Sequence, residues 1–147
     1  MADRYALEAA TRAAAVDLLE GYKADASIKL QIFRARPASV NPPCAFVDRM
    51  SARIEQTTHL FQRYPRVELI VLHGLFDTGD AVDQRDRFVD GFFDWVLDDV
   101  HAAGANTTLR LAGIEDVPVF VDDWLPPAKQ RAYFATRITL EGFAGGA

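Results

Sequence analysis

The sequence predicts one soluble α+β domain spanning residues 1–147, in which a mainly antiparallel sheet packs against one long helix, with a further helix at the N-terminus. Three observations support this fold class. Apolar residues between Val82 and His101 recur at helical spacing, the segments 28–34 and 131–142 alternate between apolar and other residues, and the first twenty residues are rich in alanine. The order helix, strands, helix, strands is typical of a sheet with its helices gathered on one face.

The N-terminal helix is expected from Tyr5 to Glu20. Asp3 is suited to cap its first turn, and Gly21 is suited to the left-handed conformation that often ends a helix. Val16 and Leu19, together with several alanines, would form its buried side.

Four strands are expected in the first half of the chain, at Ile28–Arg34, Ala45–Asp48, Ala52–His59 and Val67–Leu75. The last is the most apolar run in the sequence and is predicted to be a central strand. Proline restricts its own backbone and that of the residue before it. We therefore expect an extended loop at Arg36–Pro43 and a break at Tyr64-Pro65.

The long helix is predicted from Val82 to His101, with Asp80 as its N-cap and Gly104 as its end signal. Its other face is acidic. One wide apolar stripe is expected to anchor the core, made by Phe88, Val89, Phe92, Phe93, Val96, Leu97 and Val100.

Three strands are expected after this helix, at Thr107–Leu111, Val117–Val121 and Arg131–Gly142. Two loops would separate them. One is Gly113–Asp116, and the other is the aromatic and proline-rich segment Trp124–Lys129.

Composition excludes several classes of function. The net charge of −5 and the pI of about 5.1 disfavour direct nucleic-acid binding, because an acidic surface does not release the counterions condensed on nucleic acid. The single cysteine, Cys44, cannot form an intrachain disulfide. The N-terminus lacks the plan of a signal peptide, and no apolar run is long enough to cross a bilayer. No membrane association is therefore expected.

No catalytic motif or cofactor site is evident, and the chain is not expected to be an enzyme. The three histidines lie outside any zinc-binding frame, and no glycine-rich phosphate loop is present. A rival reading makes His73, with Asp77, an acid or base in a pocket between helix and sheet, as in a small enzyme or ligand-binding domain. The simpler reading of His73 is a strand-end histidine satisfied by its neighbours, and Cys44 is expected to be a buried hydrophobe.

The chain resembles the tail terminator proteins of long-tailed, siphovirus-type bacteriophages in its order of elements. The likeness spans most of the chain from about Leu30 onward. Its segments are Pro42-Pro43-Cys44-Ala45-Phe46-Val47-Asp48, the run from Val67 through Asp77 leading into Asp83–Asp90, and the closing strand Arg131–Gly142.

The resemblance implies a structural virion protein of the tail and neck, assembled in the host cytoplasm and needing no cofactor. It would form a closed ring of its own copies, a hexamer in the best-known members, at the head-proximal end of the tail tube. There it would stop tube growth and take part in head–tail joining. Its partners would be the tail tube protein and the head–tail connector or stopper. DNA would pass through the lumen without specific binding, which an acidic protein suits.

Subunit contacts are expected in the loops, because exposed loops and strand edges can pair with a neighbouring copy. Trp124 admits two readings, a cover for the core or a binding hot spot. A head–tail stopper or a tail tube subunit is an alternative role, because one fold can serve several functions. The candidate contact residues are Arg34, Arg36, Pro37, Glu115, Asp116, Trp124, Leu125 and Lys129.

Overall fold

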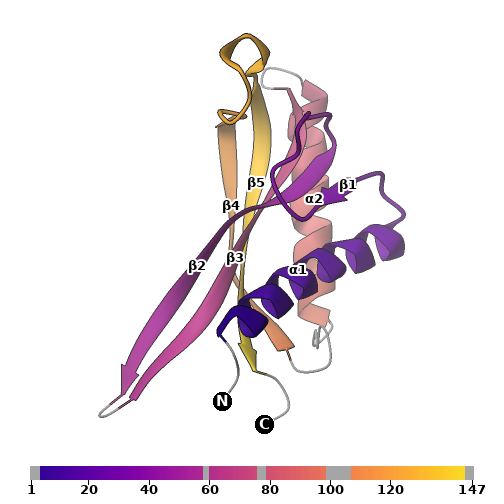
Figure 1. Cartoon of the computed structure of the whole chain (residues 1–147). Coiled ribbons are helices and arrows are strands. Elements are labelled where there is room, and N and C mark those ends of the chain that lie inside the picture. The colour runs from indigo at the N-terminus through magenta and orange to yellow at the C-terminus, as the bar shows by residue number, and fades with distance from the viewer. Residues whose placement is uncertain (1–3, 58–59, 76–78, 99–106, 145–147) are drawn as a thin grey trace.

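The computed structural model describes residues 4–57, 60–75, 79–98 and 107–144, and it is an α+β fold, as predicted (Figure 1). Two helices and a five-stranded sheet make up its main elements. The elements are α1 (Arg4–Ala26), β1 (Gln31–Phe33), β2 (Cys44–Thr57), β3 (Leu60–Leu75), α2 (Gly79–Asp98), β4 (Thr107–Val121), the 3-10 turn η1 (Pro127–Lys129) and β5 (Ala132–Ala144).

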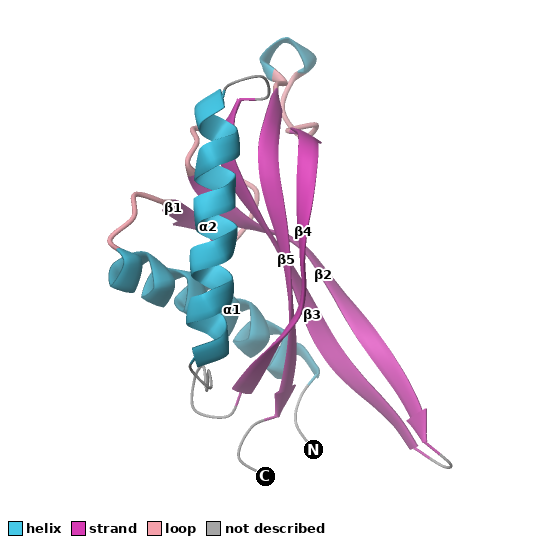
Figure 2. Cartoon of the chain, turned by 180° about the vertical axis from the view of Figure 1, so that it is seen from behind, coloured by secondary structure: helices cyan, strands magenta, loops and turns pink. Residues whose placement is uncertain are grey.

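The strand order is β1-β2-β3-β5-β4, and all neighbours are antiparallel except β1 and β2. A mainly antiparallel sheet is thereby confirmed. The prediction of one long helix as the principal partner of the sheet is too simple. α1 has 23 residues and α2 has 20, and both contribute side chains to one core against the same face of the sheet (Figure 2).

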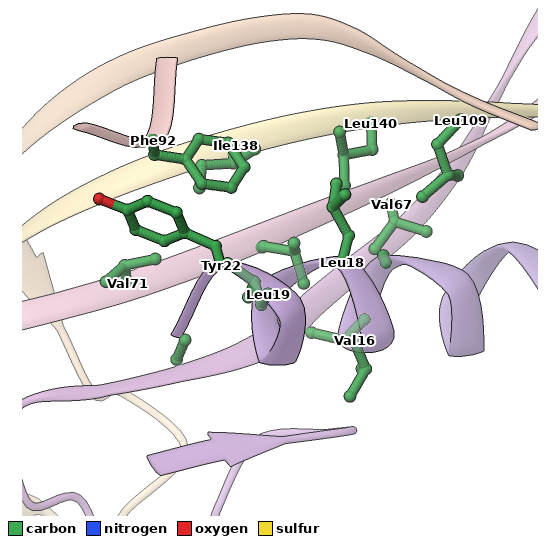
Figure 3. Close-up of a cluster of buried hydrophobic side chains, with 14 of the residues drawn as sticks. Val16, Leu18, Leu19, Tyr22, Val67, Val71, Phe92, Leu109, Ile138 and Leu140 are labelled. Carbon is green, nitrogen blue, oxygen red and sulfur yellow. The ribbon is translucent and has the colours of Figure 1, made fainter. Parts of the chain in front are cut away.

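Aromatic packing joins the two helices over the sheet. The ring of Tyr22 on α1 lies 5.3 Å from that of Phe92 on α2, with Ile138 of β5 beside them (Figure 3). Gly91 allows this approach, since a Cβ there would overlap the Tyr22 hydroxyl. The Trp95 indole N–H donates to the Asp25 carboxylate at 2.8 Å, which links the helices again.

The first helix continues past Gly21, contrary to prediction, and ends at Ala26. Ser27 takes the left-handed conformation, with φ 52°, and the Ile28 N–H donates to the Lys23 carbonyl while the Ser27 N–H donates to the Ala24 carbonyl. This pair of bonds is the Schellman ending. The helix extends because Tyr22, beyond the predicted end, is buried against α2, and that burial outweighs the local preference of a glycine. The proposed N-cap Asp3 lies outside the described residues.

β2 is one strand where two were predicted, and β3 runs through the predicted break at Tyr64-Pro65. Proline is tolerated where a strand lacks a ladder on one side. Pairing of β3 with β5 begins only at Arg66, so the segment that holds Pro65 is paired with β2 alone among the described residues. β1 is shorter than predicted, at three residues.

β4 is likewise one strand, and the predicted loop Gly113–Asp116 lies within it. Its register against β5 shifts at Leu111/Gly113 and again at Val117/Phe120. These irregularities absorb the glycine, and also Pro118, which an edge strand accepts. The bulges interrupt the local sequence pattern of a strand, and for this reason a loop was predicted at Gly113–Asp116.

The stripe on α2 is only partly buried. Phe88 and Phe92 are buried, as predicted, but Phe93 is 45% exposed and Val89 is half-buried. Asp80 lies in the first turn of the helix, where the prediction had it as the cap. The predicted residues Val100, His101 and Gly104 lie outside the described part of the chain.

Candidate assembly surfaces

A two-stranded arm extends from the body of the molecule (Figures 1 and 2). We define the arm as residues 52–57 of β2 and 60–65 of β3, which pair with each other beyond the point where β5 begins to pair with β3. Ile54 and Leu60 are each 66% exposed, so apolar surface is displayed on a ribbon with little packing of its own.

A groove between α2 and the edge strand β4 presents apolar surface at another site. Its volume is about 550 Å³, and Asp90 and Asp116 bring carboxylates to it. We call it the α2–β4 groove, and it is lined by Val89, Asp90, Phe93, Leu111, Ala112, Gly113, Ile114 and Asp116. The exposed part of the α2 stripe therefore faces this groove, alongside the edge of the sheet.

The base of the arm is tied to the body by a buried carboxylate. Glu141 of β5 is 1% exposed and accepts hydrogen bonds from Arg53 at 2.8 Å, Arg66 at 3.0 Å and Arg110 at 2.6 Å. Arg53 also lies over the Tyr64 ring, at 4.4 Å from its centroid.

The hydrogen bonds from Arg53 and Arg66, with the charge of Arg110, lower the pKa of Glu141 to about 2, although burial raises it. The arm is thus held in place by a charged cluster drawn from four strands.

Three of the predicted contact residues pack together inside the monomer. The Trp124 ring lies 5.3 Å from that of Phe46, its indole N–H donates to the Pro37 carbonyl at 2.9 Å, and Arg36 stacks over it at 5.1 Å. Arg36 also pairs with Asp48 at 2.8 Å. The structure thus favours the core-cover reading of Trp124, since its loop seals the second apolar cluster of the sheet, on the face away from the helices.

The other predicted contact residues lie on the surface of separate elements. Glu115 pairs with Arg137, and Asp116 lies 3.7 Å from Arg85 beside the α2–β4 groove. Arg34 and Leu125 lie in loops, and Lys129 is the last residue of η1; Arg34 and Lys129 are exposed, and Leu125 is half-buried. The participation of all eight residues in subunit contacts stays a prediction.

His73 lines an apolar pocket of about 410 Å³ between α2 and the sheet, with Tyr22, Val71 and Phe88. Its Nε2 lies 2.8 Å from the Thr136 hydroxyl. Burial, with the charge of Arg85, lowers the pKa of His73 to about 4 against the opposing charge of Asp86, so the ring is neutral at pH 7. No carboxylate lies among the described lining residues, and Asp77 lies outside the described chain.

Cys44 is buried in the second apolar cluster, whereas His73 packs against Phe88 of α2 on the helix-covered face. Burial raises the pKa of the Cys44 thiol to about 11, which leaves it protonated at neutral pH. Among the described residues, no three His, Cys, Asp or Glu side chains are grouped as a metal would need. Neither helix, as far as it is described, is long and apolar enough to span a membrane.

In comparisons with known proteins, no protein-family model matches this chain, and no curated protein matches it. Function is therefore inferred from the geometry of the surfaces described above and from the resemblance in segment order.

Sequence reasoning missed the arm, the groove and the Glu141 cluster. The alternation of Ile54 with Arg53 and Glu55 indicated a strand there, but no local pattern indicated that this strand extends beyond the rest of the sheet. Asp122 was also missed: it is fully buried and accepts hydrogen bonds from the Arg131 N–H at 2.6 Å and the Tyr133 hydroxyl at 3.2 Å, which close the loop around η1.

Proposed function

We propose that this protein is a phage tail terminator, which forms a ring of identical subunits at the head-proximal end of the tail tube. The ring stops tube growth and joins the tail to the head connector. The resemblance in segment order motivates this role, and the protruding arm with its exposed apolar residues is the observation that carries it. A monomeric function gives no reason to display Ile54 and Leu60 on a thin ribbon.

A ring requires a heterologous contact, in which one surface of a subunit meets a different surface of the next. The arm and the α2–β4 groove are two such surfaces. Each stable contact of this kind should bury more than about 1,000 Å² in total.

The test of the ring is a measurement of molar mass by light scattering, followed by negative-stain imaging of the purified protein alone and with tail tube protein. Rings of uniform diameter are expected. A protein that stays monomeric both alone and on tubes would refute the proposal.

Tail length separates the terminator role from its rivals. A phage lacking the protein should make abnormally long tails if the protein is a terminator. Tails of normal length that fail to join heads would indicate a stopper, and the absence of tubes would indicate a tube subunit.

Binding of a small amphipathic anion is a second candidate function, favoured by the apolar pocket beside His73. Lys29 and Arg87 line this pocket together with Leu30 and Phe88, so a carboxylate with an alkyl chain would suit it. This candidate is tested by measuring the unfolding temperature of the protein at increasing concentrations of laurate. A dose-dependent rise that is lost in Phe88→Asp would support it, and an unchanged unfolding temperature of the wild type would reject it.

A further inference from the structure

We propose that the arm of one copy of this chain inserts into the α2–β4 groove of the next copy. This inference rests on the proposed ring and names the two surfaces that build it. Both surfaces present exposed apolar side chains, Ile54 on the arm and Phe93 in the groove, and they belong to different parts of the fold.

The structure of the arm gives the first reason. A two-stranded ribbon without a third strand or a covering helix is marginal in water, because it buries little apolar surface. Within the described residues, the strands of the arm form ladders only with each other. The cluster around Glu141 holds the base of the arm, and one ion pair, Arg63 with Glu8 of α1 at 2.7 Å, holds its outer part. A partner that covers the outer part of the ribbon would supply the missing burial.

Charge favours a second copy as the partner. The segment 49–66, which contains the arm and its base, has four arginines and one glutamate, a net charge of +3 in a protein whose total is −5. The segment 79–98 of α2 has six aspartates and two arginines, a net charge of −4. Each of the four arginines also pairs with a carboxylate of the same molecule: Arg49 with Glu68, Arg53 with Glu55 and Glu141, Arg63 with Glu8, and Arg66 with Glu141. The positive charge that remains lies at the base of the arm, where Arg53, Arg66 and Arg110 outnumber Glu55 and Glu141 by one, and it favours an encounter with the acidic α2.

The placement of the two surfaces suits a head-to-tail contact. The outer ends of β2 and β3 in the arm and the helix α2 lie on opposite sides of the molecule in both views (Figures 1 and 2). The arm beyond its base and the β4 stretch of the groove, Leu111–Asp116, are each about six residues long, or roughly 20 Å at the rise of a strand. An arm of this length can therefore lie along the groove. When every subunit makes the same contact with the next one, the subunits close into a ring.

The experiment uses two full-length variants, Ile54→Asp in the arm and Phe93→Asp in the groove. Both side chains are exposed, so each monomer should fold, which far-UV circular dichroism checks. Each variant alone should dissociate to monomers, with the subunit dissociation constant raised about 30-fold or more, as expected when a central apolar contact is lost. The control Val119→Asp, at an exposed position of β4 outside both surfaces, should assemble as the wild type does.

Mixing the two variants gives the decisive result. Ile54→Asp keeps an intact groove and Phe93→Asp keeps an intact arm, so an equimolar mixture should form dimers of one copy of each and go no further. Dimers in the mixture also show that both variants are folded.

Rings formed by either variant, or a mixture that stays monomeric, would overturn the arm-in-groove contact. Dissociation of Val119→Asp to the same extent would overturn it as well, and so would a wild type that is monomeric at all concentrations. Tail length in the phage lacking the protein reports on the terminator role independently, so failure of the contact and failure of the function can be told apart.

Discussion

Replacement of Glu141 by glutamine should destabilise the protein, because three arginines converge on that carboxylate. Its pKa of about 2 lies about 2.5 units below the ordinary value of 4.5, and each unit corresponds to about 1.4 kcal/mol. The upper limit of the stabilisation is therefore about 3.5 kcal/mol. Arg110 is 58% exposed, and solvent screens its share, so we expect Glu141→Gln to lower the free energy of unfolding by about 1–2 kcal/mol at pH 7.

The pH dependence gives this prediction its sign. A carboxylate with a lowered pKa in the folded state stabilises the protein above the unfolded pKa, and that contribution is lost as the pH falls through the folded pKa. The difference in the free energy of unfolding between the wild type and Glu141→Gln should therefore have its full value above about pH 4.5 and should shrink as the pH falls toward 2.

Urea unfolding at fixed protein concentration, followed by tryptophan fluorescence, measures this difference. Glu115→Gln is the matched control, since Glu115 pairs with a single arginine at an exposed site, and its effect should stay within about 0.5 kcal/mol. Equal urea midpoints for the wild type and Glu141→Gln at pH 7, or a difference that stays constant down to pH 2, would refute the reasoning.

Three further predictions concern packing and titration. Gly142→Ala should lower the free energy of unfolding by about 1–3 kcal/mol, because the new Cβ would lie 2.6 Å from Thr11 Cγ2. Gly113→Ala is the control in the same urea assay, since the space around Gly113 is open and no such clash arises. Cys44 should resist labelling by a thiol-specific disulfide reagent until the protein unfolds, given its burial and its pKa of about 11; stoichiometric labelling of the native protein would contradict this. His73 should take up its proton near pH 4 in an NMR titration. Its folded pKa lies below the unfolded 6.5, so it should make the protein progressively less stable as the pH falls from about 6.5 to 4, and a midpoint near 6.5 would disprove its burial as a neutral ring.

The sequence by itself determined the fold class, the positions of most elements and the principal core. Periodicity placed α2 and the strand that contains Ile138, because apolar residues repeat locally with the period of the element that buries them. The alanine-rich composition placed α1, and a continuous apolar run placed the strand that contains Ile70. The resemblance to tail terminators also came from the sequence, and it motivates the proposed role without locating a contact.

Only the tertiary structure decided where elements end and which surfaces are left uncovered. Gly21 signals the end of a helix, but α1 continues because Tyr22 is buried against α2. Pro65 signals a break in a strand, but β3 continues because it pairs on one side only at that position. Glu141 and the three arginines come from four strands, and Phe93 lies beside β4 only because α2 packs against the sheet. Such arrangements depend on which distant segments become neighbours, and the spacing of residues along one segment does not encode that.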